Sequence, residues 1–277
     1  MIINHNIAAL NTHRQLSTNT TNTNKSIEKL SSGLRINRAG DDAAGLSISE
    51  KMRGQIRGLE QSSRNAQDGI SLIQTAEGSL NEVHSITQRM RELAVQSAND
   101  TNVTADRTSL QDEYDALATE ISRINTDTEF NTQKLLDGSA GNAGKVQIHV
   151  GANKDQKIEL DLSTDGIDLT TIAGDLAGGD ISTQTDAETT IKLLDDNIAK
   201  ISTGRSKLGA LQNRLEHSIA NVDNAAENLT AAESRVRDVD MAKEMMNQTK
   251  NSILAQAAQA MLAQANQQPQ GVLQLLR

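Results

Sequence analysis

The sequence predicts a mainly α protein, a long antiparallel coiled-coil helical bundle with one small β-hairpin. Three observations support this class. Aliphatic residues recur every seven positions over a long stretch of the C-terminal half, as they do along the contact seam of a coiled coil. Aromatic residues make up 1% of the 277 residues, so the core must be built from aliphatic side chains. The alternation of apolar and polar residues that is typical of strands occurs in one place, within residues 146–162.

Residues 1–44 are predicted to form an N-terminal arm and a Gly-rich connector. Two apolar stripes at helical spacing lie at the ends of the arm, formed by Ile3, Ile7 and Leu10 and by Ile27, Leu30 and Leu34. The stretch between them is almost entirely Asn, Thr and Ser, whose side chains compete for backbone hydrogen bonds. We therefore expect a helix here that forms only when it packs against another element.

Residues 45–138 are predicted to supply the N-terminal helices of the bundle. Ser47 and Glu50 match a capping box and predict the start of a helix that continues to about Asn99. A second helix, with apolar residues spaced four and three apart, follows the break at 99–104. The first helix contains four glycines that each cost about 1 kcal/mol against alanine, so we expect them to mark close approaches of other helices. These glycines are Gly54, Gly58, Gly69 and Gly78.

Residues 139–184 are predicted to hold the hairpin and a short surface loop. Apolar residues alternate with polar ones along residues 146–150 and 158–162, and a loop with Gly and Asn separates the two runs. Residues 163–184 are rich in Gly and Asp and are predicted to be irregular surface chain.

Residues 185–238 show the clearest periodicity in the sequence. Thr185 and Glu188 match a capping box at the start of this predicted helix. The repeat predicts a left-handed supercoil with another helix, because a strict seven-residue spacing keeps one seam facing its partner. The seam residues are Leu194, Ile201, Leu208, Leu215, Val222, Leu229 and Val236.

Residues 239–277 are predicted to form a C-terminal arm, which Pro269 should end or kink. The helical rhythm continues through Leu254, Ala258, Met261 and Ala265. We expect the methionines of this arm to fill packing space. They are Met241, Met245, Met246 and Met261. The sequence then finishes on a cluster of aliphatic residues, Val272, Leu273, Leu275 and Leu276.

The two apolar ends have too little of their own chain to cover them. Ordering the last twelve residues costs on the order of 12–24 kcal/mol in backbone entropy, whereas burying four aliphatic side chains returns roughly 6–12 kcal/mol. We therefore expect the ends to be disordered in a free subunit and to become ordered against neighbouring subunits. A head-to-tail contact of this kind propagates without closing and gives a filament.

Composition and motifs argue against several other classes. The net charge of −9 disfavours nucleic acid and anionic membranes as main partners, and no apolar stretch is long enough to span a membrane. No H-E-x-x-H motif or nucleophile–base arrangement is found, so we expect no enzyme, no cofactor and no metal site. Asp41 and Asp42 form a carboxylate pair without a neighbouring His or third acid, and we expect them to make subunit contacts from the connector.

Long stretches of the chain resemble bacterial flagellin, the filament subunit. They include "INHNIAALNTHRQL", "KLSSGLRINRAGDDAAGLSISEKMRGQIRGL", "NAQDGISLIQTAEGSLNEV", "MRELAVQSAND", "RLEHSIANVDNAAENLTAAESRVRDVDMAKEM" and "QAAQAMLAQANQQPQGVLQLLR". The resemblance covers roughly residues 1–137 and 185–277, and it implies that the two arms pair to line the inner tube of a filament. The middle segment is too short for the large outer domains of long flagellins, so a smooth filament is expected.

The resemblance also implies partners and a route of secretion. It implies unfolded export through the flagellar type III apparatus, a cytosolic chaperone on the C-terminal arm, and contact with the filament cap and with hook-associated junction proteins. It further implies recognition by vertebrate innate receptors, one through the leucine-rich tail and one through residues that match "QRMREL" and the next helix. In this chain the latter are Gln88, Arg89, Leu93 and Glu113.

Two alternatives remain open from the sequence. A hook–filament junction protein would share the arms and the length but would assemble only as a short ring. A secreted binding module, such as an adhesin, would use the helices only to display the hairpin and would be a stable monomer with protected ends.

Overall fold

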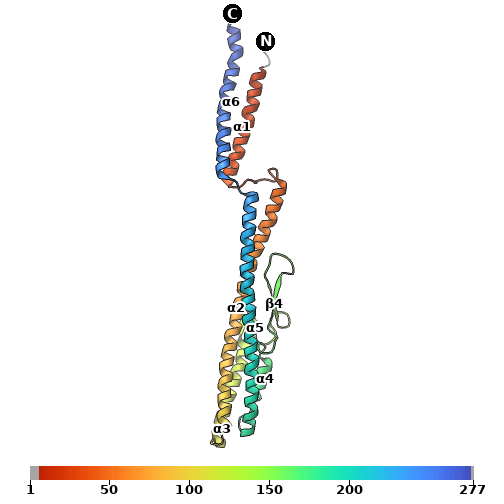
Figure 1. Ribbon diagram of the computed structural model, residues 1–277, viewed down its shortest axis with the longest axis vertical. Coiled ribbons are helices and arrows are strands. Elements are labelled where there is room, and N and C mark those ends of the chain that lie inside the picture. Colours follow the sequence, from red (N-terminus) through yellow and green to blue (C-terminus); the bar gives the residue numbers. More distant parts are fainter. Residues whose placement is uncertain (1–5, 276–277) are drawn as a thin grey trace. The chain divides into compact units, whose positions relative to one another are not determined.

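The computed structural model of the chain describes the backbone of residues 6–275 and the side chains of residues 6–267. The fold class is the predicted one, since long helices dominate and antiparallel strand pairs are short (Figure 1). The helices are α1 (Ile7–Ser32), α2 (Ala43–Ser97), α3 (Thr104–Asp127), α4 (Thr170–Ala177), α5 (Gln184–Arg237) and α6 (Met241–Leu275). The strands are β1 (Glu129–Phe130), β2 (Gln133–Lys134), β3 (Lys145–His149) and β4 (Lys157–Asp161).

The chain divides into two compact units. The arm unit, Met1–Gly54 with Asn228–Arg277, contains α1, α6 and the adjoining ends of α2 and α5. The bundle unit is Gln55–Glu227 and contains α3, α4, the strands and the greater part of α2 and α5. The boundaries predicted after residues 44 and 238 lie close to breaks between helices rather than at the limits of these units.

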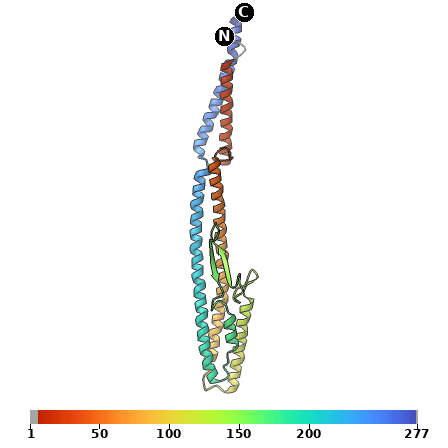
Figure 2. The same cartoon turned by 90° about the vertical axis from the view of Figure 1, so that its right-hand side faces the viewer.

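The arm unit is built on an antiparallel pair of helices, α1 and α6, which lie side by side in both views (Figures 1 and 2). The polar stretch of α1 is helical because its threonine hydroxyls bond to the chain itself. Five of them donate to the carbonyl four residues earlier, at 2.8–3.0 Å. These are Thr12, Thr18, Thr20, Thr21 and Thr23. The expected helix packed against a partner is therefore present.

The connectors that flank the arm helices are bonded to each other. Gly33 ends α1 in the left-handed conformation, with φ of 72°. The backbone N–H of Arg35 donates to the carbonyl of Arg237 at 2.7 Å, and Val239 N–H donates to the Gly33 carbonyl at 3.0 Å. This short antiparallel bridge holds the end of α1 next to the start of α6.

Both capping boxes predicted from the sequence are wrong by a few residues. Helix α2 begins at Ala43, where the Asp42 carboxylate accepts a hydrogen bond from Gly45 N–H at 2.8 Å. Helix α5 begins at Gln184, and the hydroxyl of Thr183 accepts from Asp186 N–H at 3.2 Å. In each case an earlier side-chain oxygen accepts from one free N–H of the first turn, so the later Ser47 and Thr185 are inside the helix.

The core of the bundle unit joins α2, α3, α4, α5 and the β3–β4 hairpin. Tyr114 of α3 is its largest fully buried side chain. The hairpin is confirmed with the predicted alternation, and Val146 pairs with Leu160 and Ile148 with Ile158. The inward residues of β4 are buried against the helices.

Two of the four glycines in α2 mark a close approach, but only Gly69 is approached by another helix, as predicted. A Cβ atom at Gly69 would lie 3.2 Å from Ile148 and 3.3 Å from Leu215, and one at Gly58 would lie 3.0 Å from Ala152. Gly54 and Gly78 have open space around the same position, so the expectation is wrong for them. The approaching element at Gly58 is the hairpin loop, not another helix.

Residues 163–184 are not irregular surface chain. They form α4 and two buried connections, in which a series of aliphatic side chains reaches the core: Ile167, Leu169, Ile172, Leu176 and Ile181. Leu169 N–H also donates to the carbonyl of Leu136 at 2.8 Å. The composition of this segment is rich in Gly and Asp because the chain turns sharply between buried positions.

Two further features differ from the expectations. A second hairpin, β1–β2, turns through Asn131 and Thr132, whose φ angles of 50° and 65° are those of a type I′ turn. Helix α6 continues across Pro269 to Leu275 instead of ending there. Proline lacks a backbone N–H, so the helix loses one hydrogen bond at that turn. Across the described part of the chain, no helix is long and apolar enough to cross a bilayer.

Candidate functional site

The seam between α1 and α6 is lined mostly by small and polar side chains. Along each helix, the less exposed positions recur at spacings of three and four. On α1 they include Ala9, Thr12, Leu16, Asn19, Thr23 and Ser26. On α6 they include Glu244, Gln248, Asn251, Ala255, Ala258, Leu262 and Ala265. The seam thus allows a close pairing of the arms but buries little large aliphatic surface.

Asn6 connects the two arms at the end of this seam. Its side-chain oxygen accepts from Ala9 N–H at 3.0 Å and so caps α1, while its side-chain nitrogen donates to the carbonyl of Ala265 at 2.7 Å. One amide therefore fixes both the start of α1 and its position along α6.

Among the described residues, ten large apolar side chains of the arm unit are on its surface, whereas Ile36 is buried and Leu16 and Leu262 are half-buried. Ile7 is 71% exposed and Leu10 is 66% exposed. We define the apolar arm surface as Ile7, Leu10, Ile27, Ile48, Met241, Met245, Met246, Ile253, Leu254 and Met261. The bundle unit has only Val95 and Val103 as exposed large apolar residues among those described. Exposed apolar groups that are gathered in one unit indicate an interaction surface.

The predicted assembly residues of α6 fall into two groups. Ala258 and Ala265 are 2% and 8% exposed and lie in the seam with α1, whereas Leu254 and Met261 are 42% and 52% exposed. The sequence placed these four on one stripe, but the large residues are turned out of the seam. The expectation that the α6 methionines fill packing space is wrong for the same reason: Met241, Met245, Met246 and Met261 are all exposed.

The other predicted assembly residues of the arms have mixed positions. Ile27 is exposed, and Leu30 and Leu34 are half-buried. Ile3 and Leu276 lie outside the described residues. Val272, Leu273 and Leu275 belong to the backbone of α6, but their side chains are outside the described part.

Asp41 and Asp42 are used within the connector. The Asp41 carboxylate accepts from the backbone N–H groups of Arg38 at 3.0 Å and Asn37 at 3.2 Å, and these bonds hold its pKa below the ordinary value. Asp42 caps α2 and lies 3.9 Å from Arg35. The two carboxylates therefore shape the turn into α2, and a role in subunit contact is not needed to explain them.

The residues predicted for receptor recognition lie on α2 and α3, but one of them is inaccessible. The exposed guanidinium of Arg89 pairs with Glu113 at 2.9 Å and with Glu92 at 3.1 Å. These bonds, first that with Glu113, raise the pKa of Arg89. Gln88 is exposed beside them. Leu93 is fully buried in the core of the bundle unit, so it supports this surface from inside instead of contacting a partner.

The seven-residue repeat of α5 lies partly in each unit. Leu194, Ile201, Leu208 and Leu215 are fully buried in the bundle unit. Val222 is also buried, near the end of that unit. Leu229 and Val236, which belong to the arm unit, are half-buried.

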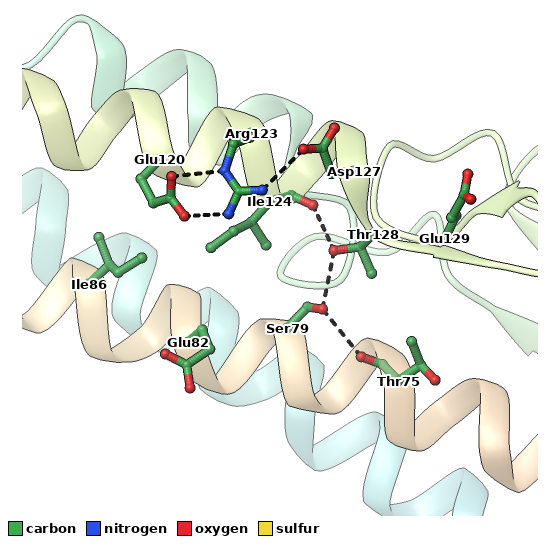
Figure 3. Close-up of a pocket in the computed structure, with 10 residues that line it drawn as sticks. All are labelled: Thr75, Ser79, Glu82, Ile86, Glu120, Arg123, Ile124, Asp127, Thr128 and Glu129. Atoms are coloured by element: carbon green, nitrogen blue, oxygen red, sulfur yellow. Dashed lines mark hydrogen bonds and ion pairs between the residues drawn. The ribbon is translucent and has the colours of Figure 1, made fainter.

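A groove of about 440 Å³ lies between α2 and α3, and the sequence did not indicate it (Figure 3). The guanidinium of Arg123 pairs there with Glu120 at 2.6 Å and with Asp127 at 3.1 Å. On the other side, the hydroxyl of Thr128 donates to that of Ser79 at 3.1 Å. The lining contains no histidine and no activated nucleophile, and the described residues include no cluster of His, Cys, Asp and Glu able to hold a metal.

Comparison with known proteins places this arrangement in a family. The model of the bacterial flagellin N-terminal helical region matches residues 3–141, and that of the bacterial flagellin C-terminal helical region matches residues 191–276. A flagellin of Halalkalibacterium halodurans is 64% identical over 277 residues, which cover 100% of both chains.

Two solved structures bear on the fold. The crystal structure of Bacillus cereus flagellin is 36% identical, with a TM-score of 0.50, and the match covers 61% of this chain and 94% of that one. A putative flagellar hook-associated protein from Vibrio parahaemolyticus is 12% identical, with a TM-score of 0.59, covering 72% and 100%. This second likeness is one of fold alone, so the junction protein is not favoured over the filament subunit. From the matched helical regions and the full-length identity, the chain belongs to the bacterial flagellin family.

Proposed function

We propose that this flagellar filament subunit polymerises through the apolar arm surface, with the α1–α6 pairs of neighbouring subunits packed against one another. The observation that carries the proposal is the placement of side chains in the arm unit, which is the opposite of that in the core of the bundle unit. The least exposed positions between α1 and α6 hold mostly small and polar groups, and ten large apolar side chains in the described part of the unit are exposed. Full burial of a completely exposed side chain of this kind gains about 1.5–3 kcal/mol, so several partly exposed ones per subunit together provide the driving force for association.

The experiment compares two pairs of exposed apolar residues. Ile7→Gln with Leu10→Gln changes the apolar arm surface, and Val95→Gln with Val103→Gln changes similarly exposed residues of the bundle unit. Because all four side chains are on the surface, we expect both variants to keep the helical content of the parent. Only the arm variant should fail to form filaments, as followed by sedimentation and electron microscopy. Normal filaments from the arm variant, or their loss from the bundle variant alone, would refute the proposal.

The wider roles belong to the same proposal. The subunit is exported unfolded by the flagellar type III apparatus to the extracellular filament, and a chaperone holds the C-terminal arm before export. It meets the filament cap and hook-associated proteins at the filament ends. The arm regions, 1–44 and 239–277, form the filament core, and residues 45–238 surround it. Support comes from the family and from the exposed arms.

Recognition by host receptors is proposed for the face that carries Gln88, Arg89 and Glu113. Support comes from their exposure and from the ion pair that joins α2 to α3 at this point. Glu113→Ala should weaken binding of a receptor ectodomain to the unpolymerised subunit, whereas Glu188→Ala, an exposed charge elsewhere in the bundle unit, should not. If both variants bind the receptor equally well, the face that carries Glu113 is not the receptor-binding surface.

A further inference from the structure

The exposed methionines of α6 are chemically distinct from the other described methionines. Met246 is 67% exposed, and Met241, Met245 and Met261 are about half exposed. Met90 is fully buried in the bundle core, and Met52 is half-buried. A thioether reacts with an oxidant in proportion to its access to solvent, so the reactive sulfurs of the described chain are concentrated on this one helix.

The reaction needs only a peroxide or a hypochlorite. The sulfur lone pair attacks an oxygen of hydrogen peroxide, the O–O bond breaks, and the sulfur gains that oxygen and loses two electrons while the peroxide is reduced to water. Methionine sulfoxide results, which is polar and chiral and can be reduced back by sulfoxide reductases. One oxygen added to each side chain thus replaces an apolar surface with a polar one.

The pairing of α1 with α6 does not place these four side chains at its buried positions. They lie outside the seam in which Ala258 and Ala265 meet α1, so a sulfoxide at any of them breaks no contact of that seam. They do make up four of the ten residues of the apolar arm surface. Oxidation therefore damages the association surface without changing the residues of the seam.

We propose that Met241, Met245, Met246 and Met261 form an oxidative modification site that switches off polymerisation of the free subunit. The inference rests on the proposed function, because it needs the apolar arm surface to be the contact between subunits. Association covers the same sulfurs, so subunits already in a filament are protected. The switch is reversible, since reduction of the sulfoxides restores the apolar surface.

The test treats purified, unpolymerised subunit with hydrogen peroxide and maps the added oxygens by peptide mass spectrometry. Oxygen should be found on the four α6 methionines before Met90. The critical concentration for polymerisation should rise about tenfold or more, since the burial of at least one side chain is lost. Helical content by circular dichroism should be unchanged, and a sulfoxide reductase should restore polymerisation.

A matched variant locates the effect. Leucine has a similar volume to methionine and cannot be oxidised, so the variant with all four α6 methionines replaced by leucine should polymerise before and after peroxide. A second variant, Met90→Leu, should remain as sensitive as the parent. If the fourfold variant polymerises poorly by itself, Met245→Leu with Met246→Leu is used, and this double variant should be partly resistant.

Two results would overturn the inference. One is oxidised parent protein that polymerises at the unchanged critical concentration, and the other is a leucine variant that peroxide inhibits as strongly as the parent. Either result leaves the proposed function intact if the Ile7→Gln, Leu10→Gln variant still fails to polymerise. Normal polymerisation of that arm variant would instead refute the proposed function itself, so the two failures are distinguishable.

Discussion

In the bundle unit the large aliphatic side chains of the α5 repeat lie in the core, whereas in the arm unit most of those of α1 and α6 lie on the surface. Both units use helices with residues spaced three and four apart, so periodicity alone does not separate them. The difference is in what occupies the buried column: Leu208 and Leu215 in one unit, Ala258 and Ala265 in the other. A column of leucines buries a large apolar area within the subunit. A column of alanines buries little, so the larger apolar side chains of these helices can be buried only against another molecule.

The largest expected effect comes from removing a side chain of the bundle core. Leu208 is fully buried, so Leu208→Ala should lower the free energy of unfolding of the bundle unit by about 2–5 kcal/mol. Denaturant unfolding followed by the single tyrosine, Tyr114, measures this. Leu254→Ala, at an exposed leucine of α6, is the control and should change the same transition by less than about 0.5 kcal/mol.

The opposite substitution probes the arm seam. Ala258 is 2% exposed, and Ala258→Leu forces extra volume between α1 and α6 at a cost of about 1–3 kcal/mol. We expect faster amide hydrogen exchange in both helices. Gln259→Leu places the same side chain at the exposed neighbouring position and should leave exchange unchanged. Slow exchange in both variants would mean that the seam has more room than its small residues suggest.

The glycines of α2 give a smaller, paired effect. Gly78 has open space where a Cβ would be, so Gly78→Ala should stabilise the bundle unit by up to about 1 kcal/mol through helix propensity. At Gly69 the new methyl group would be 3.2 Å from Ile148 and 3.3 Å from Leu215, so the gain should be offset by the crowding. Thermal unfolding should place Gly69→Ala below Gly78→Ala, and the reverse order would contradict the close approach of the hairpin.

The smallest expected effect is a pH dependence at the hairpin. Asp161 accepts from the Ser163 hydroxyl at 2.6 Å and from its N–H at 3.1 Å, and the hydroxyl bond above all lowers the pKa of this carboxylate below 3.8. A lowered pKa in the folded state adds stability above the ordinary aspartate range, and this stability is lost as the pH falls through the folded value.

Asp161→Asn should therefore be less stable than the parent at neutral pH, by less than about 1 kcal/mol because the side chain is 41% exposed and solvent screens its charge. The difference should disappear in acid, well below pH 3.8. Unfolding midpoints of the two proteins across this range are the measurement. A constant difference at all pH values would assign the effect to packing instead of charge.

The sequence predicted the helices and the β3–β4 hairpin well because long repeats and clean alternation are local signals. It failed for residues 163–184, where Ile167, Ile172 and Ile181 are buried although the surrounding composition is typical of a loop. The β1–β2 hairpin was missed because strands of two residues have no period to detect. The helix starts were misplaced because several Ser, Thr and Asp residues compete as caps, and only the three-dimensional contacts choose among them.

The candidate site was predictable in its residues but not in its orientation. The apolar stripes of α1 and α6 are visible in the sequence, but which column faces the partner helix depends on packing. Ile7 and Leu10 face out because Ala9 and Thr12, one or two positions away, fit the close seam. The same limit applies to Leu93, which matches a recognition motif in the sequence but is buried.

The Asn6 amide has a consequence for how the arms find their alignment. A column that repeats Ala258 and Ala265 seven residues apart looks nearly the same after a slip of two helical turns, so the seam alone would tolerate several offsets. The bond from Asn6 to Ala265 at one end and the Arg35–Arg237 bond at the other permit only one of them. These two hydrogen bonds, one at each end of the pair, set a single register of α1 along α6. Every copy of the subunit therefore pairs its arms with the same offset.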